Sequence, residues 1–177
     1  MLRACDVFFS VAVLLFGFPI LLILFIFGLF DTGSPIYRQV RLGRYQQKFV
    51  LLKFRTMKVS TISVPSHLVD PNSVTKLGYF MRRTKLDELP QLWNVLLGDM
   101  SLVGPRPGLC NHQELSDARK KYGVFDVLPG ITGLAQVSKI DMSTPELLAM
   151  TDNKMIRNLT LRTYFKYIFM TVFGIRH

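Results

Sequence analysis

Two adjacent carboxylates, Asp87 and Glu88, are the residues whose type and spacing point most directly to chemistry. Three cations lie just before them: Arg82, Arg83 and Lys85. Pro90 follows and fits the first turn of a helix, where a missing N–H does no harm. Cations and a helix N-terminus favour an ionised carboxylate and attract phosphate. Such a carboxylate can be a nucleophile, a metal ligand or both, although a capped helix with a solvated charge cluster is the simpler interpretation of the spacing alone.

The residues after the carboxylates predict a helix followed by a stiff loop. Apolar side chains recur at i, i+3, i+4 and i+7, which is one face of a helix: Leu89, Leu92, Trp93 and Leu96. Gly98 can end this helix, and residues 104–107 (Gly-Pro-Arg-Pro) form a loop with one cation. The carboxylates and this loop thus belong to one continuous stretch.

A short apolar run, residues 49–57, predicts a strand that carries two cations. Lys53 and Arg55 are two positions apart, so a strand would put both on one face. That face could bind phosphate, or it could be an ordinary solvated strand face, and the pattern does not distinguish the two.

The composition favours a membrane surface or phosphorylated substrates over nucleic acid. The chain has 177 residues, enough for one domain with a sizeable core, and its formal charge is +10 although 49% of its residues are hydrophobic. The aromatic residues do not alternate with basic ones on any predicted sheet, so we expect no nucleic-acid partner. Cys5 and Cys110 match no metal-site spacing and imply no disulfide framework, and Cys110 is expected to be a small core residue.

Residues 7–30 contain no charged residue and, at about 20 residues per crossing, are long enough to span a bilayer. Pro19 lies in the middle and should break or kink the helix. Two shapes are open: a kinked span, or two helices that dip into one leaflet and return. Positively charged flanks of a membrane segment usually stay on the cytoplasmic side. Both flanks are positive here, which favours the re-entrant shape: Arg3 lies on one side, and Arg38, Arg41, Arg44 and Lys48 lie on the other.

The remaining segments predict a loop, several helices and one further strand. Residues 60–73 indicate a surface loop, and we assign its His67 no role; 75–84 and 144–156 predict helices, and 111–121 predicts an exposed helix. Residues 127–137 have glycines at turn spacing and then alternate apolar with polar residues, which predicts a tight turn and a strand. Residues 159–175 predict a basic, aromatic amphipathic helix in a membrane interface, with an ordinary core helix as the alternative.

Six short motifs occur in the order typical of one family. They are residues 33–39, 53–57, 75–78, 86–92 (Leu-Asp-Glu-Leu-Pro-Gln-Leu), 98–107 (Gly-Asp-Met-Ser-Leu-Val-Gly-Pro-Arg-Pro), and 129–133 followed by Ala-Gln-Val at 135–137. The chain therefore resembles the bacterial sugar transferases, small monotopic phosphoglycosyl transferases, nearly end to end. It is similar to their minimal catalytic form, since no further membrane helix or domain precedes Val7.

The resemblance implies an α/β fold that is mostly helical with a small sheet. Residues 1–30 would form a re-entrant membrane helix broken at Pro19. Residues 31–177 would form a catalytic domain at the cytoplasmic face of the bacterial inner membrane, with amphipathic interfacial helices that include the C-terminal one.

The family's reaction is also implied. It moves a sugar-1-phosphate from a UDP-sugar to polyprenyl (undecaprenyl) phosphate and releases UMP, as the first membrane step of surface polysaccharide or glycoconjugate synthesis. Asp87 would attack the sugar-bearing phosphate, form a covalent aspartyl-phosphosugar intermediate and contact Mg²⁺. Glu88 would assist the polyprenyl phosphate or hold the proton balance of the site. By family analogy an N-acetylated amino sugar is the favoured donor, and a homodimer is left open.

The substrate-binding residues implied by the resemblance are Lys53, Arg82, Pro105, Arg106, Pro107 and Asp152. Lys53 and Arg82 would bind phosphate, and Arg106 would bind the nucleotide. Asp152 matches the aspartate of a family Asp-x-Tyr-Tyr segment, although both tyrosines are replaced here, and Leu134 stands where the family usually has tryptophan. A non-catalytic membrane-surface scaffold that binds anionic lipid is the alternative reading, and its behaviour would not depend on Asp87.

Overall fold

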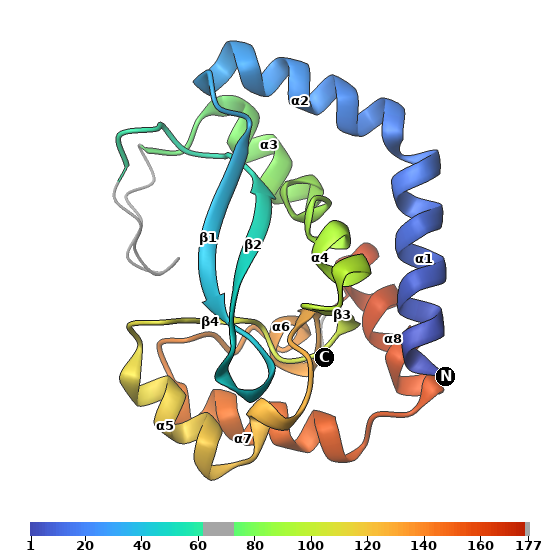
Figure 1. The fold of residues 1–177 in the computed structure, drawn as a ribbon, viewed down its shortest axis with the longest axis vertical. Helices are drawn as coiled ribbons and strands as arrows, with labels where there is room; N and C mark the ends of the chain where they lie inside the picture. Colours follow the sequence, from blue (N-terminus) through green and yellow to red (C-terminus); the bar gives the residue numbers. More distant parts are fainter. Residues whose placement is uncertain (62–72, 176–177) are drawn as a thin grey trace.

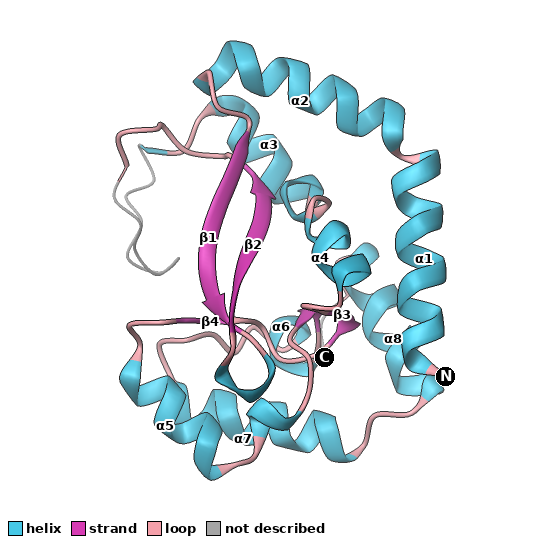
Figure 2. Ribbon diagram, in the orientation of Figure 1, coloured by secondary structure: helices cyan, strands magenta, loops and turns pink. Residues whose placement is uncertain are grey.

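The protein is mostly helical and contains two small sheets (Figures 1 and 2). The computed structural model describes residues 1–61 and 73–175, so most of the loop predicted at 60–73, with His67, lies outside the described residues. In chain order the elements are α1 (Leu2–Phe16), α2 (Phe18–Thr32), β1 (Ile36–Leu42), η1 (Arg44–Gln46), β2 (Lys48–Phe54), α3 (Lys76–Thr84), η4 (Leu86–Glu88), α4 (Gln91–Leu97), β3 (Ser101–Val103), β4 (Gly108–Leu109), α5 (Gln113–Lys121), η5 (Val124–Asp126), β5 (Gly130–Thr132), α6 (Leu134–Val137), α7 (Pro145–Arg157) and α8 (Leu161–Val172), where η marks a 3₁₀ turn. The predicted mostly helical α/β class is confirmed.

Helices α1 and α2 form a bent pair along one side of the molecule (Figure 1). The two helices meet at 65° across Gly17, two residues before Pro19. Pro19 stands in the first turn of α2, where its fixed φ suits a helix start and its missing N–H is not needed. In the described part of the chain no single helix is both long and apolar enough to cross a membrane; the bent pair taken together passes by length and composition.

The larger sheet is antiparallel, with strand order β2-β1-β4. Strands β1 and β2 pair along their whole length, from Ile36 opposite Phe54 to Leu42 opposite Lys48, which confirms the strand predicted within residues 49–57. The smaller sheet pairs β3 with β5 in parallel. Backbones come so close beside this sheet that a Cβ on Gly104 would overlap Gly130, which explains why two glycine-containing motifs meet there.

The alternation at the end of residues 127–137 was interpreted wrongly in part. Residues Gly130–Thr132 do form a strand, β5, but Leu134–Val137 fold into the short helix α6. Three of the four α6 side chains are buried. The alternation of apolar and polar residues suits a half-exposed strand, but Leu134–Val137 are mostly buried and form a helix instead.

Helices α5 and α7 pack together at the base of the molecule (Figure 1). Helix α7 confirms the prediction at 144–156. The prediction that 111–121 would be exposed is wrong, because α5 buries Leu115, Ser116, Ala118 and Arg119. The sequence pattern did not indicate this buried face of α5, because one of its residues is charged: Arg119 is buried against α7. Cys110, expected in the core, is exposed.

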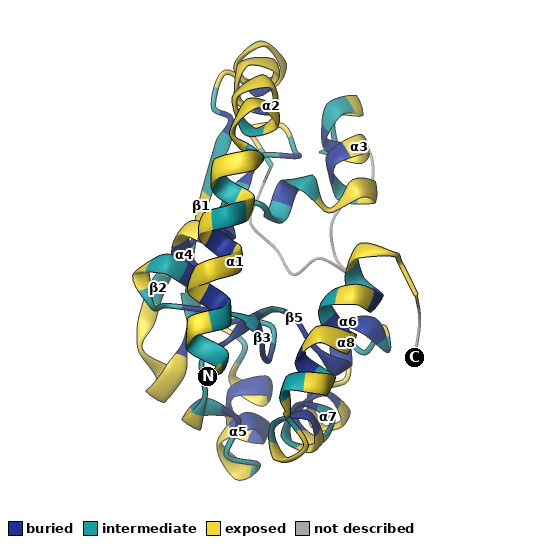
Figure 3. Cartoon of the chain, turned by 90° about the vertical axis from the view of Figure 1, so that its right-hand side faces the viewer, coloured by how far each residue is buried: buried dark blue, intermediate teal, exposed yellow. Residues whose placement is uncertain are grey.

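Helix α8 combines features of both alternatives that the sequence left open. Its Tyr164, Tyr167 and Met170 are buried in the core. On the other side Phe165 and Phe169 are exposed, and the exposed surface continues over α1 and α2 (Figure 3). Core packing of α8 is therefore observed, and its interfacial role stays a prediction.

Candidate active site

The two carboxylates lie on the 3₁₀ turn η4, between helices α3 and α4. Helix α3 ends at Thr84, and Lys85 turns the chain in the left-handed conformation (φ +63°), so that η4 starts at once. Helix α4 then begins at Gln91, after Pro90. The carboxylates thus lie on a separate 3₁₀ turn just before α4, and Pro90, predicted in the first turn of the helix, is the residue that precedes α4.

Glu88 is at the centre of a partly buried ionic group. Its Oε1 accepts hydrogen bonds from Lys53 Nζ at 2.7 Å and from Arg106 Nη2 at 3.0 Å. Lys53 comes from β2 and Arg106 from the loop between β3 and β4, so three distant segments meet at one carboxylate oxygen. Asp87, next in the chain, is 8% exposed. The structure therefore brings together Asp87, Glu88, Lys53 and Arg106, as the resemblance implied.

Asn94, which the sequence reading missed, fixes α4 against β2. Its Oδ1 accepts from Leu52 N at 3.0 Å, and its Nδ2 donates to Val50 O at 2.7 Å. Asn94 therefore acts as an extra strand residue on the edge of β2, one position away from Lys53. The predicted apolar face of the helix was wrong in one respect, since Trp93 is 52% exposed while Asn94 is buried. The sequence signal that could have identified Asn94 is its position, since it is a polar residue next to the apolar positions of the predicted helix.

The Pro105–Pro107 loop is held from two sides. Gly130 N donates to Pro105 O at 2.8 Å, and Arg41 Nη1 donates to Pro107 O at 3.4 Å. Arg41 comes from β1, and the sequence indicated it only as one of the positive charges that follow the apolar segment 7–30. Burial, together with the neighbouring charge of Arg106, lowers the pKa of Arg41 to about 10. A pKa there still leaves Arg41 charged at neutral pH, so it adds a cation to the group.

Arg82 reaches the site from α3. Its Nε donates to Thr56 Oγ1 at 2.9 Å. Helix α3 approaches so closely that a Cβ on Gly78 would overlap Thr56, which explains the glycine of the motif at 75–78. Arg55, by contrast, donates from Nε to Ser34 O at 2.8 Å, so Lys53 and Arg55 bind different partners.

Burial and charge act differently on the two carboxylates. Burial alone would raise the pKa of Glu88, but Arg106 and Lys53 outweigh it and hold that pKa well below its usual range. Burial raises the pKa of Asp87, and the opposing charge of Lys53 does not fully offset it. The expectation that cations and a helix N-terminus would keep Asp87 ionised therefore omitted the larger influence on its pKa, which is desolvation.

The group has an excess of positive charge. Four cations (Lys53, Arg41, Arg82 and Arg106) accompany two carboxylates, so two positive charges are left over. Buried charges are costly unless they are paired. An anionic ligand with about two negative charges, such as the diphosphate of a nucleotide sugar, would balance this group.

The same group fits magnesium only as a partial site. Carboxylate oxygens are ligands that Mg²⁺ accepts, and it usually binds one or two of them together with substrate phosphates. Within residues 1–61 and 73–175 no cluster of three or more His, Cys, Asp or Glu side chains could hold a metal by itself. Because Glu88 Oε1 already accepts from two cations, Asp87 is the better candidate ligand, with the remaining positions left to substrate and water.

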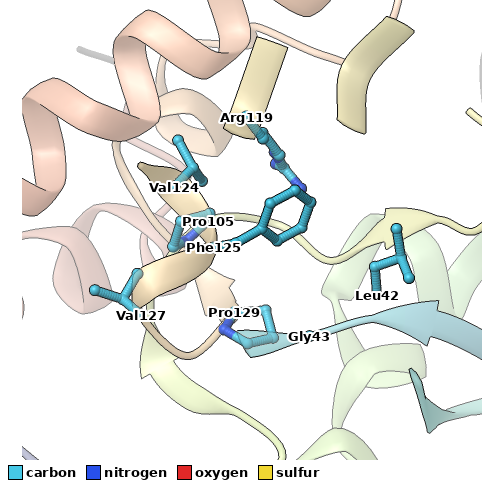
Figure 4. Close-up of a pocket in the computed structure, with 8 residues that line it drawn as sticks. All are labelled: Leu42, Gly43, Pro105, Arg119, Val124, Phe125, Val127 and Pro129. Atoms are coloured by element: carbon cyan, nitrogen blue, oxygen red, sulfur yellow. The ribbon is translucent and has the colours of Figure 1, made fainter. Parts of the chain in front are cut away.

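Asp152 belongs to a different ion pair. It is fully buried on α7, and its Oδ2 accepts from Arg119 Nη2 of α5 at 2.8 Å. Arg119 also lines a small pocket with Pro105, Phe125 and Pro129 (Figure 4). Asp152 thus sits behind a residue that faces the Pro105–Pro107 loop, and direct substrate binding by Asp152 stays a prediction.

Comparison with known proteins was made for the whole chain. Residues 1–177 match the family described as bacterial sugar transferase. The chain is 38% identical over 97% of its length to a UDP-glucose:undecaprenyl-phosphate glucose-1-phosphate transferase of Escherichia coli, and 35% identical over 96% to a UDP-galactose-lipid carrier transferase of Erwinia amylovora. It is 34% identical over 96% to an undecaprenyl-phosphate galactose phosphotransferase of Salmonella typhimurium. The chain spans 39% of the length of each of these relatives. The whole-length match and these identities show that the chain belongs to the bacterial sugar transferase family.

Proposed function

We propose that this protein transfers a sugar-1-phosphate from a UDP-sugar to polyprenyl phosphate, in two steps through a covalent intermediate on Asp87. The observation that carries the proposal is the buried group around Glu88, which combines an adjacent carboxylate with excess positive charge. The names of the relatives support the class of reaction. The intermediate, the release of UMP and the role as the initiating step are the further parts of the proposal.

In the first step, an Asp87 carboxylate oxygen attacks the phosphorus that bears the sugar. The bond from that phosphorus to the oxygen bridging the two phosphates breaks, and UMP leaves with that oxygen. The reactants and products both carry three negative charges when UMP leaves as a dianion, so no proton has to move. Lys53, Arg82 and Arg106 would bind the phosphates and balance their charge. Bound Mg²⁺ would supply further positive charge at the phosphate oxygens and favour the ionised form of Asp87.

In the second step, a phosphate oxygen of the polyprenyl phosphate attacks the same phosphorus and Asp87 leaves. The charge again balances without a proton when the acceptor is a dianion. Glu88 is then not required as a base, and its strongly lowered pKa would make it a weak one. We infer that Glu88 acts by holding Lys53 and Arg106 in place and not as a base.

The membrane part of the proposal rests on exposed apolar surface. The bent pair α1–α2 would enter one leaflet and return, and the exposed side of α8, with Phe165 and Phe169, would lie at the interface. This would place the catalytic group at the cytoplasmic face, where both substrates can reach it. The homodimer stays a prediction without further support.

The donor should be identified by the same experiment that tests the mechanism. The detergent-solubilised protein would be incubated with Mg²⁺, a short polyprenyl phosphate and a panel of UDP-sugars, and UMP release would be recorded. The resemblance favours an N-acetylated amino sugar, and the panel must also include UDP-glucose and UDP-galactose, because relatives are named for glucose and galactose.

Asp87→Asn should reduce UMP release at least roughly a thousandfold, because the nucleophile is lost. Asp117→Asn, the same change on the exposed side of α5, is the matched control and should leave the rate unchanged. Release that persists in Asp87→Asn would contradict the covalent mechanism. Protein that binds anionic vesicles but releases no UMP from any donor would favour the scaffold.

A further inference from the structure

Helix α1 carries a polar stripe that the catalytic mechanism does not use. Arg3, Asp6 and Ser10 are spaced at i, i+3 and i+7, so they lie on one face of the helix. Arg3 and Asp6 are the only charged residues within positions 1–30. This face is turned toward the catalytic domain, because Asp6 is 2% exposed and α1 packs against α4 and β3.

Arg3 binds the carboxyl end of α4. Its Nη2 donates to Val95 O at 2.6 Å and to Leu96 O at 3.3 Å, and its Nη1 donates to Met100 O at 3.2 Å. The last carbonyl groups of a helix have no partner within the helix, and a cation there is favourable. Arg3 therefore completes α4, although the two are more than 90 residues apart.

Asp6, on the same face, accepts hydrogen bonds from β3 and α8. Its Oδ1 accepts from Ser101 Oγ at 3.0 Å, from Leu102 N at 2.9 Å and from Tyr164 Oη at 2.8 Å. Ser101 and Leu102 belong to β3, and Tyr164 is a fully buried residue of α8. One carboxylate oxygen of α1 thus joins two other elements of the domain.

These contacts determine how α1 is oriented. A buried carboxylate is costly unless donors surround it, and the three donors come from β3 and α8. One residue of rotation turns a helix by about 100°, so a slip would remove Arg3 and Asp6 from their partners together. The contacts of Arg3 and Asp6 therefore favour one rotation of α1 about its own axis and one position of α1 along that axis relative to the domain.

The same contacts reach the catalytic group through α4. Asn94 connects α4 to β2, the strand that carries Lys53, and α4 begins three positions after Glu88. We propose that Arg3 and Asp6 are positioning residues that fix the bent pair α1–α2 relative to α4, β3 and α8, and thereby set where a membrane-held polyprenyl phosphate meets Asp87. This inference rests on the proposed function.

The two half-reactions should respond differently if the proposal holds. The UDP-sugar arrives from water and meets residues of η4, β2 and the Pro105–Pro107 loop. The acceptor phosphate is held by its lipid at one height in the bilayer, so it depends on how the bent pair is placed. Loosening α1 should therefore slow the second step and leave the first unchanged.

Arg3→Gln and Asp6→Ala would be tested in the full chain, reconstituted in phospholipid nanodiscs prepared with and without polyprenyl phosphate. Ser10→Ala is the matched control, because Ser10 is buried on the same face but its hydroxyl has no hydrogen-bond partner. The first step would be read as the burst of UMP without acceptor, and the second as polyprenyl-diphospho-sugar formed per second. Burst size also reports how much protein is folded.

We expect Arg3→Gln and Asp6→Ala to reduce acceptor turnover about 10- to 100-fold, with burst rate and size unchanged and with kcat/KM for the UDP-sugar unchanged. A short, water-soluble polyprenyl phosphate at high concentration should restore most of the turnover. Ser10→Ala should behave as the unmodified protein in every assay.

Tyr164→Phe tests the same contact with little change in packing, since it removes only the hydroxyl that Asp6 accepts from. It should also lower acceptor turnover selectively, to a smaller extent. A parallel loss of burst and turnover in all three variants, or no change in any of them, would overturn the proposal. Absence of a UMP burst in the unmodified protein would instead refute the proposed function itself.

Discussion

Two buried ion-paired groups in this protein differ in their balance of charge. Around Glu88 the cations outnumber the carboxylates, and Arg106 keeps a side-chain exposure of 39%. Between α5 and α7, Arg119 and Asp152 form a one-to-one pair with exposures of 3% and 0%. Both groups are short-range ion pairs, but of the two only the group around Glu88 has more cations than carboxylates.

The difference separates a binding site from a structural contact more clearly than distance or burial does. A one-to-one pair has no net charge left to neutralise, although Arg119 Nε and Asp152 Oδ1 have no hydrogen-bond partner in the described part of the chain, and removing one residue leaves the other charge buried. An unbalanced group is stable only where water solvates the excess charge or an anionic ligand neutralises it. This contrast gives Asp152 and Asp87 opposite expected behaviour, although both are buried carboxylates in motifs of the same family.

The largest expected effect on stability is at the balanced pair. Asp152→Ala leaves Arg119 buried without its partner and should lower the free energy of unfolding by about 3–5 kcal/mol. Chemical denaturation in detergent would measure it. The UMP burst per folded molecule should stay unchanged, because Asp152 does not contribute to the excess charge around Glu88.

The double change Arg119→Met with Asp152→Leu is the control, since it removes both charges and should recover much of the lost stability. If Asp152→Ala abolished the burst in protein that is still folded, Asp152 would be a substrate-binding residue, as the resemblance implied.

Glu88→Gln should show the opposite behaviour. It removes the carboxylate that holds Lys53 and Arg106, so we expect UMP release to fall about 10²- to 10³-fold while the free energy of unfolding changes little. Glu146→Gln is the matched control, because Glu146 pairs with Lys121 at 2.6 Å but both are exposed. A loss of stability as large as that of Asp152→Ala would show that Glu88 has a structural role instead.

The pH dependence of stability offers the smallest and sharpest contrast. Burial, only partly offset by Arg119, raises the pKa of Asp152 to about 6, whereas an unfolded aspartate titrates near 3.9. The folded protein therefore holds a proton more strongly than the unfolded chain between these values. Stability should decrease by about 2–3 kcal/mol as pH rises from 4 to 6, and this contribution should be constant above that range. Asp152→Asn, which stays neutral, should lack the decrease when unfolding is followed at several pH values.

The sequence predicted which charged residues lie together around Glu88, because its signals are local. The adjacent pair Asp87 and Glu88, the cation of the Gly-Pro-Arg-Pro loop and Lys53 in an apolar strand can all be recognised within short windows. The helices at 75–84 and 144–156 were predicted for the same reason, since their periodicity is local. Two assignments were incorrect: α6 was predicted as a strand, and α5 was predicted to be exposed. Both depend on which distant residues cover the segment, and a short stretch of sequence does not contain that information.

What the sequence determined by itself was the fold class, the family motifs and the types of residue in the candidate site. Only the tertiary structure determined which charges meet. Lys53 and Glu88 are 35 positions apart, and Asp6 and Tyr164 are 158 apart. Arg3, Arg41 and Asn94 gained their roles in the same way, from backbone carbonyls and amides of other elements. The physical reason is that the state of a buried charge is set by its partners and its desolvation, and both exist only once the chain has folded.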